Sequence, residues 1–223
     1  MSIAKHLEHT LLKPEATVAD ILRLCDEAVK AGIYGVCINP CYVELAKHYL
    51  GEADVKVITV VGFPLGASTS AEKSLAASVA VLNHADELDM VMNIGAFKTG
   101  DYKAVQADIA AVVRGAQGLP VKVIIEACLL NEAEKIQACQ LIAGGGAQFV
   151  KTSTGFNKGG ATLADVQLLK AEADKLGLQV KAAGGIRDYQ TARAMLAAGA
   201  ERIGTSAGAK IVLEEQGDRG AMQ

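Results

Sequence analysis

The sequence predicts a single (β/α)8 barrel of the TIM type that spans residues 1–223. Short β-branched runs alternate with amphipathic stretches along the whole chain, which is the pattern of parallel strands joined by crossover helices. The strands are apolar almost throughout, as expected for strands that are buried on both faces. No Pro/Ser-rich linker interrupts the alternation, and 51% of the 223 residues are hydrophobic, which is enough for a sizeable core.

Eight strands can be counted, which is the number that a TIM barrel requires. In chain order they are expected at residues 7–12, 35–39, 56–62, 87–93, 122–127, 148–153, 179–184 and 202–206. Helical periodicity lies between them, for example in residues 18–32, 70–85, 103–117, 132–146 and 163–177. Several of these stretches end in glycine, which suits a helix C-terminus. An open, doubly wound sheet has the same alternation and remains the alternative.

Composition and charge favour a small-molecule partner. The net charge of −3 and the absence of a basic run argue against nucleic acid and anionic membranes. The N-terminal segment has no signal-peptide apolar stretch and no segment is long enough to span a bilayer, so a cytoplasmic location is expected. The five cysteines and four histidines show no ligand spacing, and no nucleotide-binding motif occurs, so neither a metal nor another cofactor is expected.

Three lysines stand at matching positions in otherwise apolar strands. Lys122, Lys151 and Lys181 each directly follow a valine on the expected strands five, six and seven. A single lysine at a strand edge usually extends into water, but three in register favour a shared chemical role. Active sites of barrels lie at the C-terminal strand ends, and glycine-bearing loops soon follow Lys151 and Lys181. These two lysines are therefore expected to be neighbours in the site.

Two neighbouring lysines suit Schiff-base chemistry. Only a neutral amine attacks a carbonyl, and a second ammonium about 4.5 Å away disfavours the charged form by about 3.7 kcal/mol at an effective dielectric of about 20. One lysine of the pair is then the nucleophile, and the other perturbs its charge and carries protons. Asp89 lies within the fourth apolar run, where an ion pair with Lys122 and a role in proton transfer are compatible readings.

The run "RIGTSAG" (202–208) allows two interpretations. Its G-x-S-x-G pattern is that of a hydrolase nucleophile elbow, but that fold needs a histidine after the serine, and all four histidines precede Ser206. The preferred interpretation is a phosphate-binding loop, which "AAGGIR" (182–187) completes after strand seven. Tight turns would explain the glycines of either segment alone.

The combination of these segments resembles the deoxyribose-phosphate aldolase family. The resemblance runs from "EHTLLKP" to "RIGTSAG" and includes "GVCINP", "ELDMVMNIG", "KVIIEA", "VKTSTGF" and "VKAAGGIR" in the family's order. It implies a class I aldolase on a TIM barrel that reversibly joins acetaldehyde and glyceraldehyde 3-phosphate to give 2-deoxyribose 5-phosphate. No metal or organic cofactor is implied.

Carried over by motif, the resemblance makes Lys151 the Schiff-base lysine, with Asp89 and Lys181 as proton donors and acceptors. The residues that it implies for substrate binding or its support are Cys37, Lys122, Thr152, Gly155, Gly185, Gly204 and Ser206.

Two departures from the family pattern bear on the site. Glu8 stands where an aspartate is common, which leaves the contacts of the first strand open, and the C-terminal "GDRGAMQ" lacks the tyrosine that some members use in proton transfer. A sugar-phosphate-binding barrel without turnover is the alternative function. A homo-oligomer is compatible with the sequence.

Overall fold

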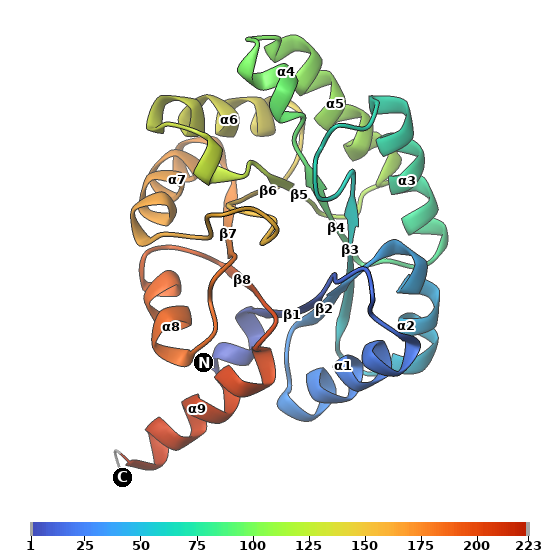
Figure 1. The fold of residues 1–223 in the computed structure, drawn as a ribbon, viewed down its shortest axis with the longest axis vertical. Helices are drawn as coiled ribbons and strands as arrows, with labels where there is room; N and C mark the ends of the chain where they lie inside the picture. The colour runs from blue at the N-terminus through green and yellow to red at the C-terminus, as the bar shows by residue number, and fades with distance from the viewer. Residues whose placement is uncertain (1, 222–223) are drawn as a thin grey trace.

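The computed structural model describes residues 2–221 and shows a closed barrel of eight parallel strands (Figure 1). The strands are β1 (Leu7–Leu11), β2 (Gly35–Ile38), β3 (Lys56–Val61), β4 (Glu87–Val91), β5 (Val121–Ile124), β6 (Phe149–Lys151), β7 (Gln179–Ala183) and β8 (Arg202–Thr205). Each strand pairs with the next in sequence, and β1 pairs with β8. The predicted (β/α)8 barrel is therefore confirmed, and the open sheet is excluded.

Helices surround the barrel and cover the outer face of the strands (Figure 1). They are α1 (Val18–Ala31), α2 (Val43–Leu50), α3 (Ser70–Leu82), α4 (Ile94–Lys98), α5 (Tyr102–Gly115), α6 (Glu132–Gly144), α7 (Leu163–Leu176), α8 (Tyr189–Ala197) and α9 (Gly208–Ala221). Three short 3-10 turns complete the described elements: η1 (Ile3–His6), η2 (Pro40–Tyr42) and η3 (Ala127–Leu129).

Local sequence fixes where the major helices begin. Thr17 and Thr69 start α1 and α3 with capping boxes, in which the threonine side chain and the acid three residues later satisfy each other's backbone N–H groups. Asn131 does the same for α6. Because the helices start at defined residues, the loops that precede them at the C-terminal end of the barrel have fixed lengths.

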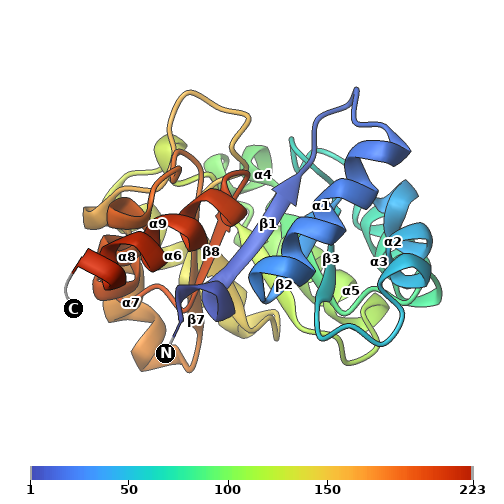
Figure 2. The same cartoon turned by 90° about the horizontal axis from the view of Figure 1, so that it is seen from below.

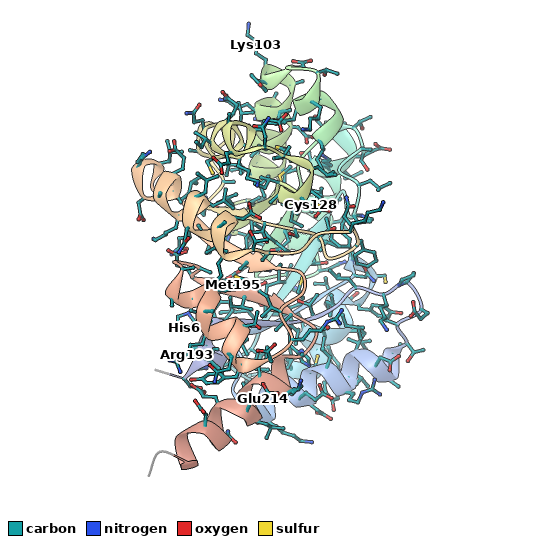
Figure 3. All side chains as sticks on the ribbon, turned by 60° about the vertical axis from the view of Figure 1, so that its left-hand side comes forward. His6, Lys103, Cys128, Arg193, Met195 and Glu214 are labelled. Atoms are coloured by element: carbon teal, nitrogen blue, oxygen red, sulfur yellow. The ribbon has the colours of Figure 1, made fainter. Side chains whose placement is uncertain are left out.

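The chain ends pack together on one flank. Figure 2 places both ends of the described chain on the same side of the barrel. There the Glu214 carboxylate of α9 accepts the backbone N–H of Tyr189 at 2.7 Å, which joins α9 to the start of α8. Side chains of both helices, among them Arg193, Met195 and Glu214, lie on this flank beside His6 of η1 (Figure 3). This bond holds α9 against the start of α8, which follows the loop after β7.

Apolar packing accounts for most of the barrel, with one continuous core cluster between strands and helices. A second, smaller cluster of Leu12, Cys37, Ile58 and Val60, with Phe63 packed against it, belongs to β2, β3 and the loops after β1 and β3. Charged side chains occupy the remaining part of the barrel interior, from β4 to β7 and β1. No helix in residues 2–221 is both long and apolar enough to cross a membrane.

Candidate active site

Strand register brings the predicted lysines and aspartate together. Asp89 on β4 lies opposite Lys122 on β5, and Lys151 on β6 lies opposite Lys181 on β7. All four side chains are buried, and successive residues of a strand point to opposite faces. The four charges therefore converge inside the barrel near its C-terminal end.

Asp89 is the centre of this group. Its Oδ1 accepts a hydrogen bond from Lys122 Nζ at 2.9 Å, and its Oδ2 accepts from Lys151 Nζ at 2.7 Å and Lys181 Nζ at 2.6 Å. The ion pair between Asp89 and Lys122 that the sequence suggested is present. One carboxylate thus holds both lysines of the predicted pair.

The neighbouring charges determine how these groups titrate. Burial alone would raise the pKa of Asp89, but Lys122, Lys151 and Lys181 together hold the pKa of this carboxyl well below its usual value. Burial would likewise lower the pKa of Lys181, yet Asp89 and Glu8 raise it above its usual value. Asp89 is therefore an anion, and Lys181 an ammonium, at neutral pH.

Glu8 is a site residue that sequence reasoning left without a contact. This fully buried carboxylate accepts a hydrogen bond from Lys181 Nζ and lies 3.5 Å from Lys122 Nζ. Glu8 pairs in register with Gly204 of β8, so it enters the site from the strand that closes the barrel. Its alternation in "LEHTLL" would have placed it on one face, but only closure shows which face and which partner.

The charged group continues toward the N-terminal end of the barrel. Lys122 Nζ lies 2.6 Å from Glu87 Oε2, and Glu87 in turn accepts the Tyr34 hydroxyl. The guanidinium carbon of Arg202 lies 3.9 Å from the centre of the Tyr34 ring. Burial, followed by the hydrogen bond to Glu87, raises the pKa of Tyr34, so this hydroxyl stays protonated at neutral pH.

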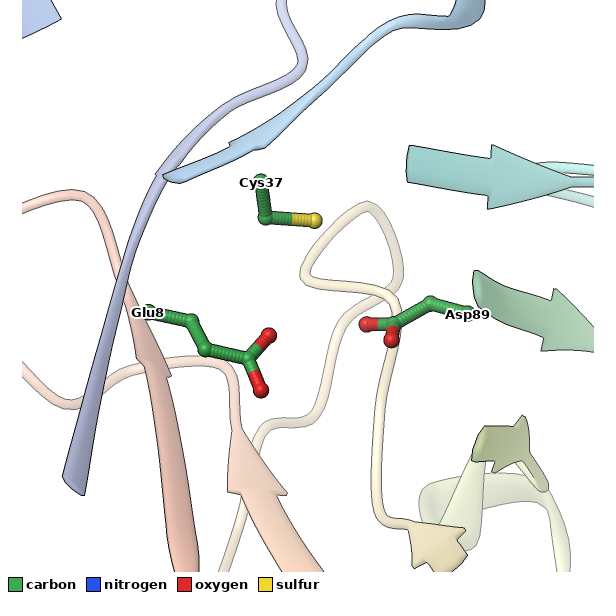
Figure 4. A group of neighbouring side chains, drawn as sticks. All are labelled: Glu8, Cys37 and Asp89. Carbon is green, nitrogen blue, oxygen red and sulfur yellow. The ribbon is translucent and has the colours of Figure 1, made fainter. Parts of the chain in front are cut away.

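Glu8, Cys37 and Asp89 point toward one another and could in principle hold a cation (Figure 4). However, lysine ammonium groups already bond to both carboxylates. Burial, then the Asp89 charge, raises the pKa of Cys37 to about 11, so its sulfur is a neutral thiol at neutral pH. A divalent cation would have to displace ammonium groups and meet a protonated thiol, so the donor set does not suit a metal.

A cavity of about 360 Å³ opens above this charged group, at the C-terminal end of the barrel. Lys151 forms part of its wall, together with loop residues that follow β1, β6, β7 and β8. Figure 2 shows the loops after β1 and β6 rising from the edge to which the β1 arrow points. The predicted residues Gly155, Gly185, Gly204 and Ser206 all line this cavity.

The loops of the cavity wall offer donors for an anion. Gly185 has φ +81°, a conformation that favours glycine. The backbone N–H groups of Gly185 and Ser206 have no protein acceptor among residues 2–221. Lys13 and Arg187 also line the cavity, are exposed and form no ion pair within the described chain. Neither cation had been singled out from the sequence.

A protein-family model described as DeoC/LacD family aldolase matches residues 4–214. The chain belongs to this family. It is 58% identical over 217 residues to the deoxyribose-phosphate aldolase of Thermococcus gammatolerans, covering 95% of this chain and 96% of the relative. The corresponding enzyme of Thermococcus kodakarensis is 56% identical, covering 94% of this chain and 95% of the relative.

Solved structures of the family superpose closely. The aldolase QR15 matches with a TM-score of 0.94 and 39% identity, covering 99% of both chains. A structure described as a putative deoxyribose-phosphate aldolase of Coccidioides immitis has a TM-score of 0.94 and 43% identity, covering 96% of this chain and 85% of that one. The fold and the family assignment thus agree.

Of the residues predicted for substrate binding in this aldolase, three do not lie on the cavity wall, and neither do Asp89 and Lys181. Cys37 and Lys122 are fully buried below it. The Thr152 hydroxyl is also buried, and it donates to the Ala183 carbonyl while accepting the Ala183 N–H, both at 3.0 Å. Thr152 therefore joins β6 to β7, and its predicted contact with substrate stays a prediction.

Gly204 serves a purpose that the sequence did not reveal. A Cβ atom at this position would lie 3.2 Å from Lys181 Cε and 3.1 Å from Ala183 Cβ. The missing side chain therefore leaves room for the Lys181 side chain as well as opening the cavity.

Proposed function

We propose that this aldolase reversibly cleaves 2-deoxyribose 5-phosphate to glyceraldehyde 3-phosphate and acetaldehyde through a Schiff base on Lys151. The observation that carries the proposal is the position of Lys151, which lines the cavity while its Nζ lies 2.7 Å from the buried Asp89 carboxylate. Relatives named for this activity share more than half of the sequence. Leu12 is an apolar residue of the cavity wall and packs with Ile58 and Val60, which suits the short acetaldehyde chain.

The proposed reaction begins with addition of the Lys151 amine to the sugar aldehyde. The carbinolamine loses water to give an iminium ion. The C2–C3 bond then breaks: the C3 hydroxyl loses its proton, the C2–C3 electron pair moves into the iminium to form an enamine, and glyceraldehyde 3-phosphate leaves. The enamine is protonated at C2, and water hydrolyses the new iminium, which releases acetaldehyde and regenerates the lysine.

Asp89 and Lys181 are suited to move the protons of these steps. Lys181 Nζ donates a 2.6 Å hydrogen bond to the Asp89 carboxylate, and Asp89 also accepts a hydrogen bond from Lys151 Nζ. Because Glu8 and Asp89 favour the charged form of Lys181, this residue starts the cycle as an acid. We propose that Glu8 and Lys122 act through Lys181 and Asp89, by fixing their positions and charges.

The phosphate is proposed to bind at these loops of the cavity wall, away from Lys151. The N–H groups of Gly185 and Ser206 and the cations of Lys13 and Arg187 supply hydrogen bonds and positive charge there. This arrangement places the phosphate remote from the bond that breaks, so binding energy can orient the sugar over Lys151.

A cleavage assay with two matched variants tests this function. The wild type is expected to release acetaldehyde from 2-deoxyribose 5-phosphate, and Lys151→Met is expected to abolish the release. Lys158→Met removes an exposed lysine of the same loop and is expected to keep the activity. A wild type that binds the sugar phosphate without cleaving it would show a binding barrel instead of an aldolase.

We also propose that the aldolase is a cytoplasmic homo-oligomer. Leu75, Val79 and Leu82 are exposed by 66%, 43% and 72% and form an apolar stripe at helical spacing on α3. The solved structure of the 33% identical Aeropyrum pernix aldolase is described as tetrameric. All five cysteines are free, which suits a reducing compartment. Light scattering on the wild type and on Leu82→Glu tests the assembly. An equal mass for the two proteins would exclude this surface as the interface between subunits.

A further inference from the structure

Tyr34 reaches the charged interior of the barrel from the end opposite the cavity. It directly precedes β2, it is partly buried, and its hydroxyl donates to Glu87 Oε1. The other oxygen of this carboxylate, Oε2, lies 2.6 Å from Lys122 Nζ. Tyr34, Glu87 and Lys122 do not line the cavity, so they can act on the reaction only through other residues.

Lys122 connects this tyrosine to the reactive lysine. Its Nζ also donates to Asp89 Oδ1 at 2.9 Å, and Asp89 Oδ2 accepts from Lys151 Nζ at 2.7 Å. Glu87 and Asp89 therefore share one ammonium group. A stronger attraction of Lys122 to Glu87 would leave less of its positive charge to Asp89, and Asp89 would then hold the Lys151 ammonium more strongly.

The charges of this group balance only while Lys151 is protonated. Three ammonium groups then face three carboxylates, namely Lys122, Lys151 and Lys181 against Glu8, Glu87 and Asp89. The neutral amine of Lys151 that attacks an aldehyde leaves one carboxylate in excess. Because an unbalanced buried charge is costly, a donor that stabilises one of these carboxylates favours the reactive amine.

Tyr34 is such a donor. Burial, then the hydrogen bond to Glu87, raises the pKa of Tyr34, so its proton stays in place for this bond. Within the described chain, the charged side chains that contact Tyr34 and Glu87 are Arg202, whose guanidinium carbon lies 3.9 Å from the centre of the tyrosine ring, and Lys122. Glu8 faces Lys122 from β1 at 3.5 Å. The hydroxyl is thus the neutral donor that partly compensates the charge of Glu87.

We propose that Tyr34 is a positioning residue that, through its hydrogen bond to Glu87, favours the neutral amine of Lys151. It does so by leaving the Lys122 ammonium to Asp89. The inference rests on the proposed function and adds to it a residue at the opposite end of the barrel from the substrate. It follows that removing the Tyr34 hydroxyl and removing the Glu87 charge should shift the working pH in opposite directions.

The pH dependence of acetaldehyde trapping by cyanoborohydride tests this inference, because trapping needs the Lys151 amine but no sugar phosphate. In Tyr34→Phe, Glu87 should draw Lys122 away from Asp89. The midpoint of the rise in trapping rate with pH should therefore move up by about half a unit relative to the wild type in the same buffers. Tyr49→Phe removes a hydroxyl that donates to Asp26 at 2.9 Å on the surface, and it should keep the wild-type midpoint.

Glu87→Gln should give the opposite change. It removes one carboxylate, so the neutral amine of Lys151 no longer leaves an excess, and the midpoint should move down by about one unit. Glu132→Gln, the same change on the exposed start of α6, should keep the wild-type midpoint. In the double variant, Tyr34→Phe should add no upward shift, because the tyrosine acts through the glutamate.

Tyr34→Phe keeps the shape of a partly buried side chain, so this comparison does not depend on how well Glu87→Gln folds. A purely structural role of Tyr34 would lower the trapping rate at every pH without moving the midpoint, and that result would overturn the inference. The same upward shift in the Glu87→Gln background would also overturn it. A wild type that is not trapped at any pH would instead refute the proposed function itself.

Discussion

At the scale of single residues, Lys181 depends on two carboxylates, Glu8 and Asp89, that come from different strands. They raise the pKa of Lys181 although burial opposes it. An ammonium is thereby kept beside Lys151, which is the arrangement that the two neighbouring lysines in the sequence suggested. The charge is retained because the counter-ions are buried with it.

Lys181→Leu tests whether this ammonium sets the working pH. The variant removes a positive charge next to Lys151, so we expect cleavage activity to fall and its pH optimum to move to higher pH. Lys181→Arg keeps the charge but transfers protons poorly, so its activity should fall while its pH optimum stays where it is in the wild type. A pH–rate profile decides, and an unshifted optimum in the leucine variant would show that Lys181 does not perturb the nucleophile.

Some site residues were visible in the sequence and others were not, for a physical reason. Lys122, Lys151 and Lys181 stood out because charges within apolar strands are costly unless they are used or paired. Glu8 shares the site, but its partner Lys181 lies 173 positions away and only barrel closure joins them.

At the scale of elements, β8 and the start of α9 serve two neighbouring parts of the site. Gly204 lines the cavity and also makes space for Lys181, and Ser206 lines the cavity two residues later. The sequence suggested that both belong to the phosphate loop. Both line the cavity, and the structure adds that a side chain at position 204 would point at Lys181 Cε.

Gly204→Val is therefore expected to damage the lysine site. A valine side chain would displace Lys181, so both cleavage of the phosphorylated sugar and trapping of acetaldehyde should fall at least tenfold, provided circular dichroism shows a folded protein. If cleavage fell while trapping stayed at the wild-type level, Gly204 would act on the phosphate alone.

Arg187→Gln is expected to affect the phosphate end selectively. Removing this cation should raise KM for 2-deoxyribose 5-phosphate by about tenfold, in keeping with the loss of one charge-assisted hydrogen bond. Cleavage of unphosphorylated 2-deoxyribose should change little. The ratio of kcat/KM for the two sugars measures the effect, and an equal change for both would place the phosphate elsewhere.

Strand positions were predictable to within a few residues, because apolar runs mark buried strands. The sixth strand was expected at 148–153 but extends only over Phe149–Lys151. Thr152 follows the strand, but its backbone N–H still donates to the Lys181 carbonyl of β7 at 3.1 Å, while its hydroxyl bonds to Ala183 on the same strand. Such a side chain to backbone contact depends on the neighbouring strand, which periodicity within one segment cannot reveal.

At the scale of the whole molecule, closure of the barrel encloses several charges in one apolar shell. Lys122, Lys151 and Lys181 face Asp89, Glu8 and Glu87, so that positive and negative side chains are matched. Removing one member of such a group leaves a buried charge unpaired, which costs about 3–5 kcal/mol of stability.

The charged interior should give a characteristic dependence of stability on pH. Because the pKa of Asp89 is lowered in the folded state, its contribution is present above the ordinary value of 3.8 and is lost as pH falls through the folded value. Lys122 and Lys181 have raised pKa values, so their contribution is present below 10.5 and is lost as pH rises further. Calorimetry should therefore show that these groups cause no loss of folding stability between about pH 5 and 9.

The contribution of Asp89 to stability can be measured by comparing the Tm of Asp89→Asn with that of the wild type at different pH values. Its Tm should be lower at neutral pH, and the difference from the wild type should shrink below pH 3.8, where the wild type loses the Asp89 contribution. A constant difference in Tm down to pH 2 would contradict this assignment.

Reductive trapping tests the central claim most directly. Acetaldehyde and borohydride added together should inactivate the wild type and leave one ethyl group on the Lys151 side chain, located by mass spectrometry of the digested protein. Lys151→Met should remain unlabelled under the same conditions. An ethyl group found on Lys122 or Lys181 instead, or no label while the wild type turns over, would contradict the account.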